Sequence, residues 1–258
     1  MINVSNSKMS HNLNYKLNLL NTSNTSNYTS NYTSNNTRHV IYDKNNILNN
    51  SNTNYIAKRD FLFRFIDSNI RNQIIMDDES LYSTTDQLTA DRISKDILKF
   101  LPSTSTITDA TACIGGTAYS FSQHFQTVHA IEIDHTRFNL LVHNLKILAK
   151  ESTNIAYYND DFIHICKKIK QNAIFIDPPW GGPDYKKIQK LSLYISNIEL
   201  SEICKDIFNY TEYIVIKVPT NFDEEKFINN TKGIIQLVHK NTALRKMYLL
   251  VFKCNTII

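Results

Sequence analysis

The sequence is poor in residues that give the backbone unusual shapes: its 258 residues include five glycines, five prolines and a single tryptophan. Most of these residues fall in two stretches, DATACIGGTAY (residues 109–119) and DPPWGGPDYKK (residues 177–187). Glycine adopts backbone conformations that other residues avoid, whereas proline fixes the backbone and lacks an N–H donor. Since the chain concentrates both residue types in two places, we expect these stretches to be functional loops.

Other absences exclude whole classes of protein. The four cysteines form no CxxC pair, so we expect neither a metal site nor disulfides, and the thiols suit a reduced, intracellular protein of the nucleus or cytoplasm. No apolar run approaches the length of a membrane span, and the amino terminus lacks the apolar stretch of a secretory signal. The formal net charge of +4 is compatible with an anionic partner. We expect a globular monomer that does not enter a membrane.

The composition divides the chain into three parts. Residues 1–54 are dominated by Asn, Ser and Thr, and we predict that they are disordered because they cannot bury enough apolar surface to offset the entropy of ordering. Residues 55–84 mix basic and aromatic side chains at helical spacing, which predicts a small helical lobe. Residues 85–258 are expected to form one larger domain.

Within this larger domain, apolar strands alternate with helices. The expected strands cover residues 106–112, 127–134, 155–160, 172–177 and 212–218, and the expected helices cover residues 85–101, 117–125, 137–150 and 199–208. Thr85 is predicted to cap the first helix. Residues 234–254 predict two strands joined by a turn. Together these patterns indicate an α/β fold with a mostly parallel, doubly wound sheet and a carboxyl-terminal antiparallel hairpin.

Polar residues follow the first four expected strands. They are Asp109 with Gly115 and Gly116, then Glu132 and Asp134, then Asp161, and last Asp177 to Trp180. In open α/β sheets, ligands bind beyond the carboxyl ends of the strands, where the strand order reverses. We therefore expect all four groups to meet at one edge of the sheet.

The first three groups fit a nucleoside cofactor. Glycines after one strand and a carboxylate at the end of the next, here Glu132 with Asp134, suit a loop beside a ribose whose hydroxyls the carboxylate binds. A GxGxxG pattern for a pyrophosphate is missing, which favours S-adenosylmethionine. Asp161 would then receive the adenine amino group, with Phe162 against the ring. Two structural alternatives stay open: the glycine pair as a tight turn, and Asp161 as a helix cap.

The fourth group, Asp-Pro-Pro-aromatic after a strand, is typical of methyltransferases that act on the exocyclic amino groups of bases. The two prolines leave carbonyl acceptors, and an amino nitrogen conjugated to a base is a poor nucleophile. If the Pro178 carbonyl and the Asp177 side chain accept its two N–H groups, its lone pair turns toward the methyl donor. Trp180 would stack on the base. The alternative is a buried loop with a core tryptophan.

The longer string DPPWGGPDY resembles the trimethylguanosine synthase family, whose members hypermethylate the cap of RNA. Further segments match in order: Tyr55 onward, YSTT at residues 82–85, DATACIGG at residues 109–116, AIEID at residues 130–134 and DDF at residues 160–162. The resemblance spans residues 55 to 254. It implies a class I (Rossmann-like) S-adenosylmethionine-dependent methyltransferase, with Thr85 among the residues that bind the cofactor.

The resemblance also implies the substrate. It would be 7-methylguanosine-capped RNA, methylated at the exocyclic N2 to give di- or trimethylguanosine. Trp180 would stack on the cationic base, which adds a cation–π attraction, with Tyr185 beside it. Lys58, Arg59 and Arg64 are candidates for the triphosphate; the alternative is a solvated basic helix face.

The sequence departs from the family pattern at four positions: Cys113 replaces a glycine, Asp177 stands where serine is common, and Asn54 and Thr220 replace an expected lysine and arginine. Lys58 or Lys217 would have to supply the missing positive charge. Two other functions stay open. One is methylation of guanine N2 or adenine N6 in internal RNA or DNA, and the other is a catalytically silent RNA-binding subunit.

Overall fold

In the computed structural model, residues 53–150 and 153–255 are described. The segment predicted to be disordered lies outside them except for Thr53 and Asn54, which begin helix α1 (Thr53–Leu62). Helices α2 (Ser68–Arg71) and α3 (Ser80–Ser83) complete the segment predicted as a helical lobe. All the described residues belong to one compact unit, and the division at residue 84 stays a prediction. None of the described helices is long and apolar enough to cross a membrane.

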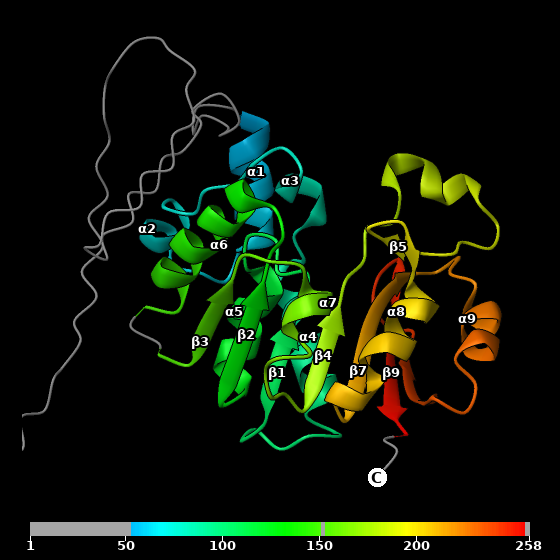
Figure 1. The fold of residues 1–258 in the computed structure, drawn as a ribbon. Helices are drawn as coiled ribbons and strands as arrows, with labels where there is room; N and C mark the ends of the chain where they lie inside the picture. Colours follow the sequence, from blue (N-terminus) through cyan, green and yellow to red (C-terminus); the bar gives the residue numbers. More distant parts are fainter. Residues whose placement is uncertain (1–52, 151–152, 256–258) are drawn as a thin grey trace, which may run out of the picture. The chain divides into compact units, whose positions relative to one another are not determined.

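A seven-stranded sheet forms the centre of the fold, in the order β3-β2-β1-β4-β7-β9-β8 (Figure 1). Its strands are β1 (Thr106–Asp109), β2 (Thr127–Ile131), β3 (Ile155–Tyr158), β4 (Ala173–Ile176), β7 (Tyr213–Pro219), β8 (Ile235–Asn241) and β9 (Met247–Cys254). Strands β3, β2, β1, β4 and β7 pair in parallel. Strand β9 pairs antiparallel with both β7 and β8. The predicted mostly parallel sheet with a carboxyl-terminal antiparallel hairpin is confirmed.

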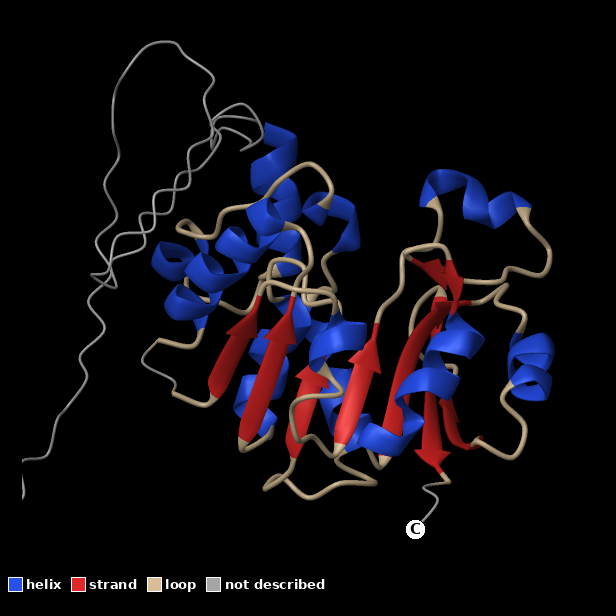
Figure 2. Ribbon diagram, viewed as in Figure 1, coloured by secondary structure: helices blue, strands red, loops and turns tan. Residues whose placement is uncertain are grey.

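Helices cover both faces of the sheet, as Figure 2 shows. They are α4 (Gln87–Ile97), α5 (Gly116–His124), α6 (His135–Leu148), α7 (Phe162–Ile165), α8 (Leu200–Ile207) and α9 (Glu224–Asn230). Successive side chains of a strand point to opposite faces, so Phe175 and Val215 pack in one apolar cluster while Ile174 and Ile214 pack in the other. This two-sided burial explains why the central strands are apolar throughout.

The first long helix does not begin as predicted. Helix α4 starts at Gln87 with Asp86 in the N-cap position, and an Asp86 carboxylate oxygen accepts a hydrogen bond from the Thr89 hydroxyl at 2.6 Å. The prediction that Thr85 caps this helix was therefore wrong. The Thr85 hydroxyl instead accepts a hydrogen bond of 2.8 Å from the Lys217 ammonium, because a buried ammonium group needs acceptors.

A buried asparagine ties the leading segment to the sheet domain. The Asn144 side chain on α6 accepts a hydrogen bond from the Ile75 amide at 2.9 Å and donates to the Ile75 carbonyl at 2.8 Å. It also donates to the Ile114 carbonyl, in the glycine loop, at 3.3 Å. One side chain thus fixes the leading segment and the loop that follows β1.

Replacing this side chain tests the attachment. Asn144→Ala should lower the free energy of unfolding by about 1–3 kcal/mol, because it leaves buried backbone groups without partners. Chemical denaturation followed by circular dichroism measures the change. Asn139→Ala on the same helix is the control, since the Asn139 side chain makes no hydrogen bond among the described residues; equal losses in both variants would contradict the assignment.

Candidate active site

The glycine loop between β1 and α5 is shaped by close packing. Gly115 has a φ of +99°, and an added Cβ would lie 2.8 Å from Leu145 Cγ. A Cβ on Gly116 would lie 2.7 Å from the Thr85 carbonyl oxygen. The pair therefore makes a tight turn, one of the alternatives that the sequence left open, and it lets the leading segment approach the loop.

Cys113 occupies the position at which the resembling family has glycine. Its φ of +50° lies in the left-handed region, where a residue with a Cβ is strained. Its backbone amide donates to Glu132 Oε2 at 3.0 Å. The loop thus keeps a backbone conformation that favours glycine, and the carboxylate that ends β2 holds it in place.

The acidic residues after β2 and β3 all organise backbone. Glu132 Oε1 accepts the Asp134 amide at 2.9 Å, and burial raises the pKa of the Glu132 carboxyl. Asp134 caps α6 by accepting the Arg137 amide at 2.8 Å. Asp161 caps α7 by accepting the Ile163 amide at 2.9 Å, and Phe162 behind it is buried. The helix-cap alternative for Asp161 is thus what the structure has, and cofactor binding by these residues stays a prediction.

Asp109, the last residue of β1, has an unsatisfied carboxylate oxygen. The side chain is buried, and Oδ2 has no hydrogen-bond partner in the described structure. Burial raises the pKa of Asp109 to about 8, and the nearby Asp177 and Glu132 carboxylates add to the rise. A buried oxygen without a partner is costly unless a ligand supplies a donor or a positive charge. S-adenosylmethionine carries both an ammonium and a sulfonium group, so this residue fits the expected cofactor.

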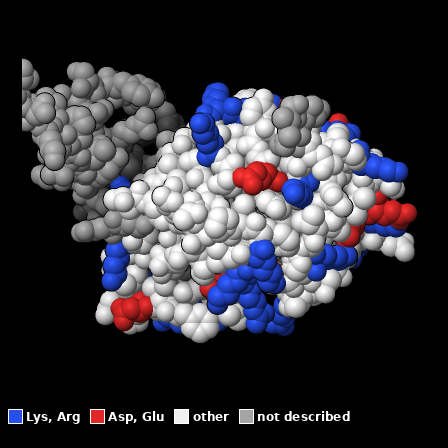
Figure 3. Space-filling model, turned by 90° about the horizontal axis from the view of Figure 1, so that it is seen from below, with Lys and Arg blue, Asp and Glu red and all other residues white. Residues whose placement is uncertain are grey.

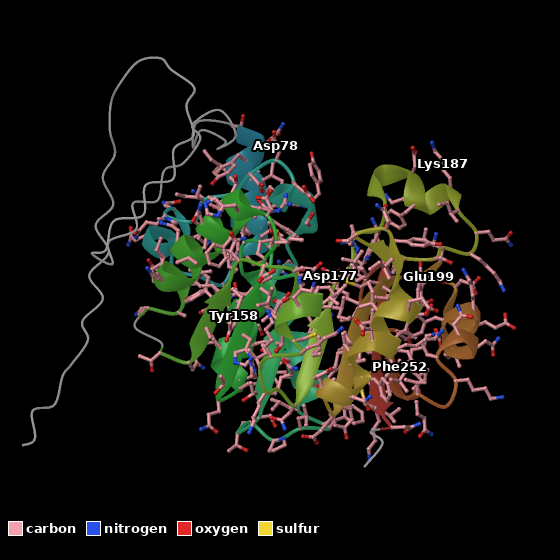
Figure 4. The ribbon with its side chains drawn as sticks, in the orientation of Figure 1. Asp78, Tyr158, Asp177, Lys187, Glu199 and Phe252 are labelled. Atoms are coloured by element: carbon pink, nitrogen blue, oxygen red, sulfur yellow. The ribbon has the colours of Figure 1, made fainter. Side chains whose placement is uncertain are left out.

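Asp177 lies just beyond β4, at the centre of the carboxyl edge of the sheet (Figure 4). Its backbone amide donates to the Thr111 hydroxyl at 2.9 Å. Its carboxylate Oδ2 accepts a hydrogen bond from the ammonium of Lys217, which is 5% exposed and also binds Thr85. Burial raises the pKa of Asp177, and the Lys217 charge offsets only part of the rise. From the sequence, Lys217 was expected only as a phosphate-binding cation. A lone charge inside the apolar strand YIVIKVP was the signal for this buried pair.

Trp180 lies half-buried beside the same pair. Its ring meets that of Tyr185 edge-on, with centroids 5.3 Å apart and an interplanar angle of 72°. The Lys217 ammonium nitrogen lies 5.7 Å from the Trp180 ring centroid. The indole Nε1 is buried without a hydrogen-bond partner in the described structure.

The backbone on either side of Trp180 is constrained. Pro178 is buried, while Gly181 and Gly182 have φ values of +85° and +72°. The loop therefore turns sharply after Trp180 and leads into the 3-10 helix η1 (Gly182–Lys187).

The basic residues of the leading segment differ in how available they are. Arg59 is 4% exposed, and its guanidinium donates to the Asn72 side-chain oxygen at 2.6 Å. Arg64 forms an ion pair of 2.8 Å with Asp86. The Lys58 ammonium lies 5.9 Å from the exposed Tyr82 ring. Contact of Arg59 and Lys58 with a triphosphate stays a prediction, and in this structure only Lys58 of the three makes no ion pair among the described residues.

Charge on the opposite side of the molecule is mainly positive. Figure 3 shows the face at the amino ends of the parallel strands, where Lys and Arg side chains are more widespread than Asp and Glu. The acidic groups of the candidate site lie instead at the carboxyl ends, in the loops after β1, β2, β3 and β4. The positive charge at the amino ends therefore lies on the other side of the sheet from the candidate site.

The model of one protein family, described as RNA cap guanine-N2 methyltransferase, matches residues 104–248. The chain belongs to this family. Its members use S-adenosylmethionine as methyl donor, and the resemblance predicted from the motifs is confirmed. The matched residues include every predicted site residue that follows β1, β2, β3 or β4.

Curated relatives support the family assignment. The chain is 31% identical over 132 residues to an uncharacterised protein of Acanthamoeba polyphaga mimivirus, an alignment that covers 49% of this chain and 51% of the relative. It is 28% identical over 156 residues to trimethylguanosine synthase of Schizosaccharomyces pombe, covering 58% of this chain and 64% of the relative. The chain thus spans between half and two thirds of the length of these relatives.

Two solved structures have the same fold. A candidate methyltransferase from Porphyromonas gingivalis W83 superimposes with a TM-score of 0.57 at 13% identity, over 73% of this chain and 45% of the other. A candidate RNA methyltransferase from Pyrococcus horikoshii gives a TM-score of 0.50 at 14% identity, over 67% and 86% of the two chains. These comparisons confirm the predicted Rossmann-like methyltransferase fold.

The raised pKa of Asp109 predicts that cofactor binding releases a proton. Near pH 7 the free carboxyl is mostly protonated, since its pKa is about 8, and a cationic cofactor beside it favours the ionised form. Binding of S-adenosylmethionine should therefore release about one proton. Calorimetry in buffers of different ionisation enthalpy measures this number. Asp109→Asn should abolish the release, and a wild-type enthalpy that is the same in all buffers would contradict the prediction.

Proposed function

We propose that the protein transfers methyl groups from S-adenosylmethionine to the exocyclic N2 of 7-methylguanosine caps of RNA, giving di- or trimethylguanosine, and acts as a monomer in the nucleus or cytoplasm. The family match supports this proposal. The observation that carries it is that Asp177, Trp180 and Asp109 all lie around Lys217. The Lys217 ammonium binds the Asp177 carboxylate, lies 5.7 Å from the Trp180 ring centroid and offsets part of the rise that burial causes in the pKa of Asp109.

The cofactor would lie along the loops after the first three strands. Its sulfonium supplies an activated methyl group. Asp109 offers its unpartnered oxygen to a positive charge, and the Gly115–Gly116 turn, which is closely packed against Leu145 and Thr85, would present its backbone to the cofactor. Glu132 and Asp134 would bind the ribose, and Asp161, Phe162 and Thr85 would surround the adenine. The helical lobe of residues 55–84 would cover this region, with Thr85 directly after it.

Asp177 and Pro178 would prepare the amino group for attack. The Pro178 carbonyl and the Asp177 carboxylate would each accept one N–H of N2, which directs the nitrogen lone pair toward the methyl group. The nitrogen would bond to the methyl carbon as the bond from that carbon to sulfur breaks, and the nitrogen would become positive. The Asp177 carboxylate would be the protein group that can take the proton from N2.

Trp180 would select the methylated cap. Methylation at N7 makes the base a cation, and stacking of a desolvated cation on indole contributes about 1–2 kcal/mol. The Lys217 charge near the same ring is balanced by Asp177, so it does not repel the base as a lone cation would. Tyr185 supports the indole from the edge, and Lys58 is the available candidate for the triphosphate.

Mass spectrometry of products tests the proposal. The purified protein is incubated with S-adenosylmethionine and two cap analogues, one methylated at N7 and one not. Added methyl groups on the N7-methylated analogue alone would support the proposal, and their number would separate the dimethyl from the trimethyl product. Methylation of both analogues, or of neither despite cofactor binding, would point to an internal nucleic-acid target. Loss of cofactor binding would indicate a silent subunit.

The stacking role of Trp180 can be tested separately. Trp180→Ala should lower kcat/KM for the N7-methylated cap by about 5- to 30-fold, the loss of the cation–π attraction, and should change the affinity for S-adenosylmethionine less than twofold. Steady-state kinetics and calorimetry measure the two quantities. Trp180→Phe is the matched control and should keep an intermediate rate, whereas normal turnover in Trp180→Ala would rule out stacking on this ring.

A further inference from the structure

Lys217 is a buried charge whose partners all belong to the candidate site. It lies on β7 between apolar residues, and the preceding Ile216 is fully buried. Its ammonium donates to the Asp177 carboxylate and, at 2.8 Å, to the Thr85 hydroxyl. Burying an ammonium group is costly unless it is paired, so the burial of this lysine near the carboxyl end of β7 depends on these partners.

The ion pair leaves half of the Asp177 carboxylate available. Lys217 binds Oδ2, while Oδ1 makes no hydrogen bond among the described residues. The side chain of Asp177 is 16% exposed. Lys217 therefore fixes the direction of the carboxylate and leaves one oxygen free for a ligand at the edge of the sheet.

Burial would otherwise favour the neutral form of the Asp177 carboxyl. It raises the pKa of Asp177, and Lys217 offsets part of the rise. The Asp177 and Glu132 carboxylates raise the pKa of the neighbouring Asp109 carboxyl on β1. Arg137 on α6 offsets the charge of Glu132 at 3.7 Å. Among the described groups that contact Asp177, Lys217 is the cation that favours the carboxylate.

We infer that Lys217 is a specificity-determining residue: by holding Asp177 as an oriented carboxylate, it makes the site accept the guanine edge and reject the adenine edge. The inference rests on the proposed function and adds a choice of base to it. It also makes Lys217 a positioning residue, because it acts on the base through Asp177.

The chemistry of the two bases explains the choice. Guanine presents the N1–H next to the N2 amino group, so both groups nearest to the free oxygen of an ionised carboxylate, which only accepts, are donors. Adenine presents its N6 amino group next to the N1 lone pair, which an ionised carboxylate repels and a protonated one would bind. The protonation state of Asp177 therefore selects the base. Methylation at N7 strengthens the match, since a cationic guanine is a better donor.

The first test measures the Asp177 carboxyl itself in the full-length chain. Its titration is followed by NMR with 13C-labelled aspartate and assigned by the signal lost in Asp177→Asn. Lys217→Met should raise the midpoint by about one pH unit or more, because an adjacent opposite charge is removed, and Lys217→Arg should restore it. An unchanged midpoint in folded Lys217→Met would overturn the inference.

The second test measures base preference without turnover. Trp180 is the only tryptophan of the chain, so quenching of its fluorescence reports nucleotides that reach the site. Wild type should bind GTP about tenfold or more tightly than ATP. Lys217→Met should lose most of this ratio, because a protonated Asp177 would donate toward the N1–H of guanine instead of accepting from it. Lys217→Arg should retain it. A wild-type ratio near one, or a ratio unchanged in Lys217→Met, would overturn the inference.

A second variant covers the case in which Lys217→Met does not fold, and the methyl-transfer assay separates this inference from the proposed function. If Lys217→Met fails to fold by circular dichroism, Asp177→Asn gives the same ratio test, because an amide offers both an acceptor and a donor and should bind the two nucleotides about equally. Absence of methyl transfer to the N7-methylated cap, with the GTP preference and its dependence on Lys217 intact, would count against the proposed function and support the role of Lys217.

Discussion

The parallel strands bring carboxylates together at one edge of the sheet, and the negative charge collected there has to be balanced. β1 and β4 are neighbours, and the Asp177 carboxylate raises the pKa of the Asp109 carboxyl. β7 is the next strand along, and it supplies Lys217. The arrangement of the site, the closeness of Thr85 and the position of Trp180 all depend on this ammonium group, since it contacts each of them.

The leading segment and the glycine loop are shaped by one another. Gly116 has no side chain where the Thr85 carbonyl approaches, and the Thr85 hydroxyl reaches across to Lys217. Asn144 holds the same segment against the loop from the other side. Thr85 precedes the first strand by more than twenty positions and is nevertheless part of the site. A substitution that shifts the leading segment would therefore also disturb the hydrogen bond to Lys217, near the carboxyl end of β7.

Much of the fold could be predicted from the sequence, because the alternation of apolar strands and amphipathic helices is a local pattern. The loops after four strands were also placed correctly, since the carboxyl ends of parallel strands share an edge. The pairing of Lys217 with Thr85 and Asp177 could not be predicted in this way, because it joins residues 132 and 40 positions apart. The environment of Arg59 could not be predicted either. A basic residue at helical spacing gives the same sequence pattern whether it faces solvent or, as here, binds Asn72 inside the fold.

The order of the last two strands has a consequence for how the chain assembles. β9 follows β8 in the sequence but lies between β7 and β8 in the sheet. β8 therefore cannot join the sheet before β9 does, and until then β7 has an open edge of unpaired backbone groups. During synthesis the outer edge of the strand that carries Lys217 therefore stays uncovered until residues 247–254 have left the ribosome.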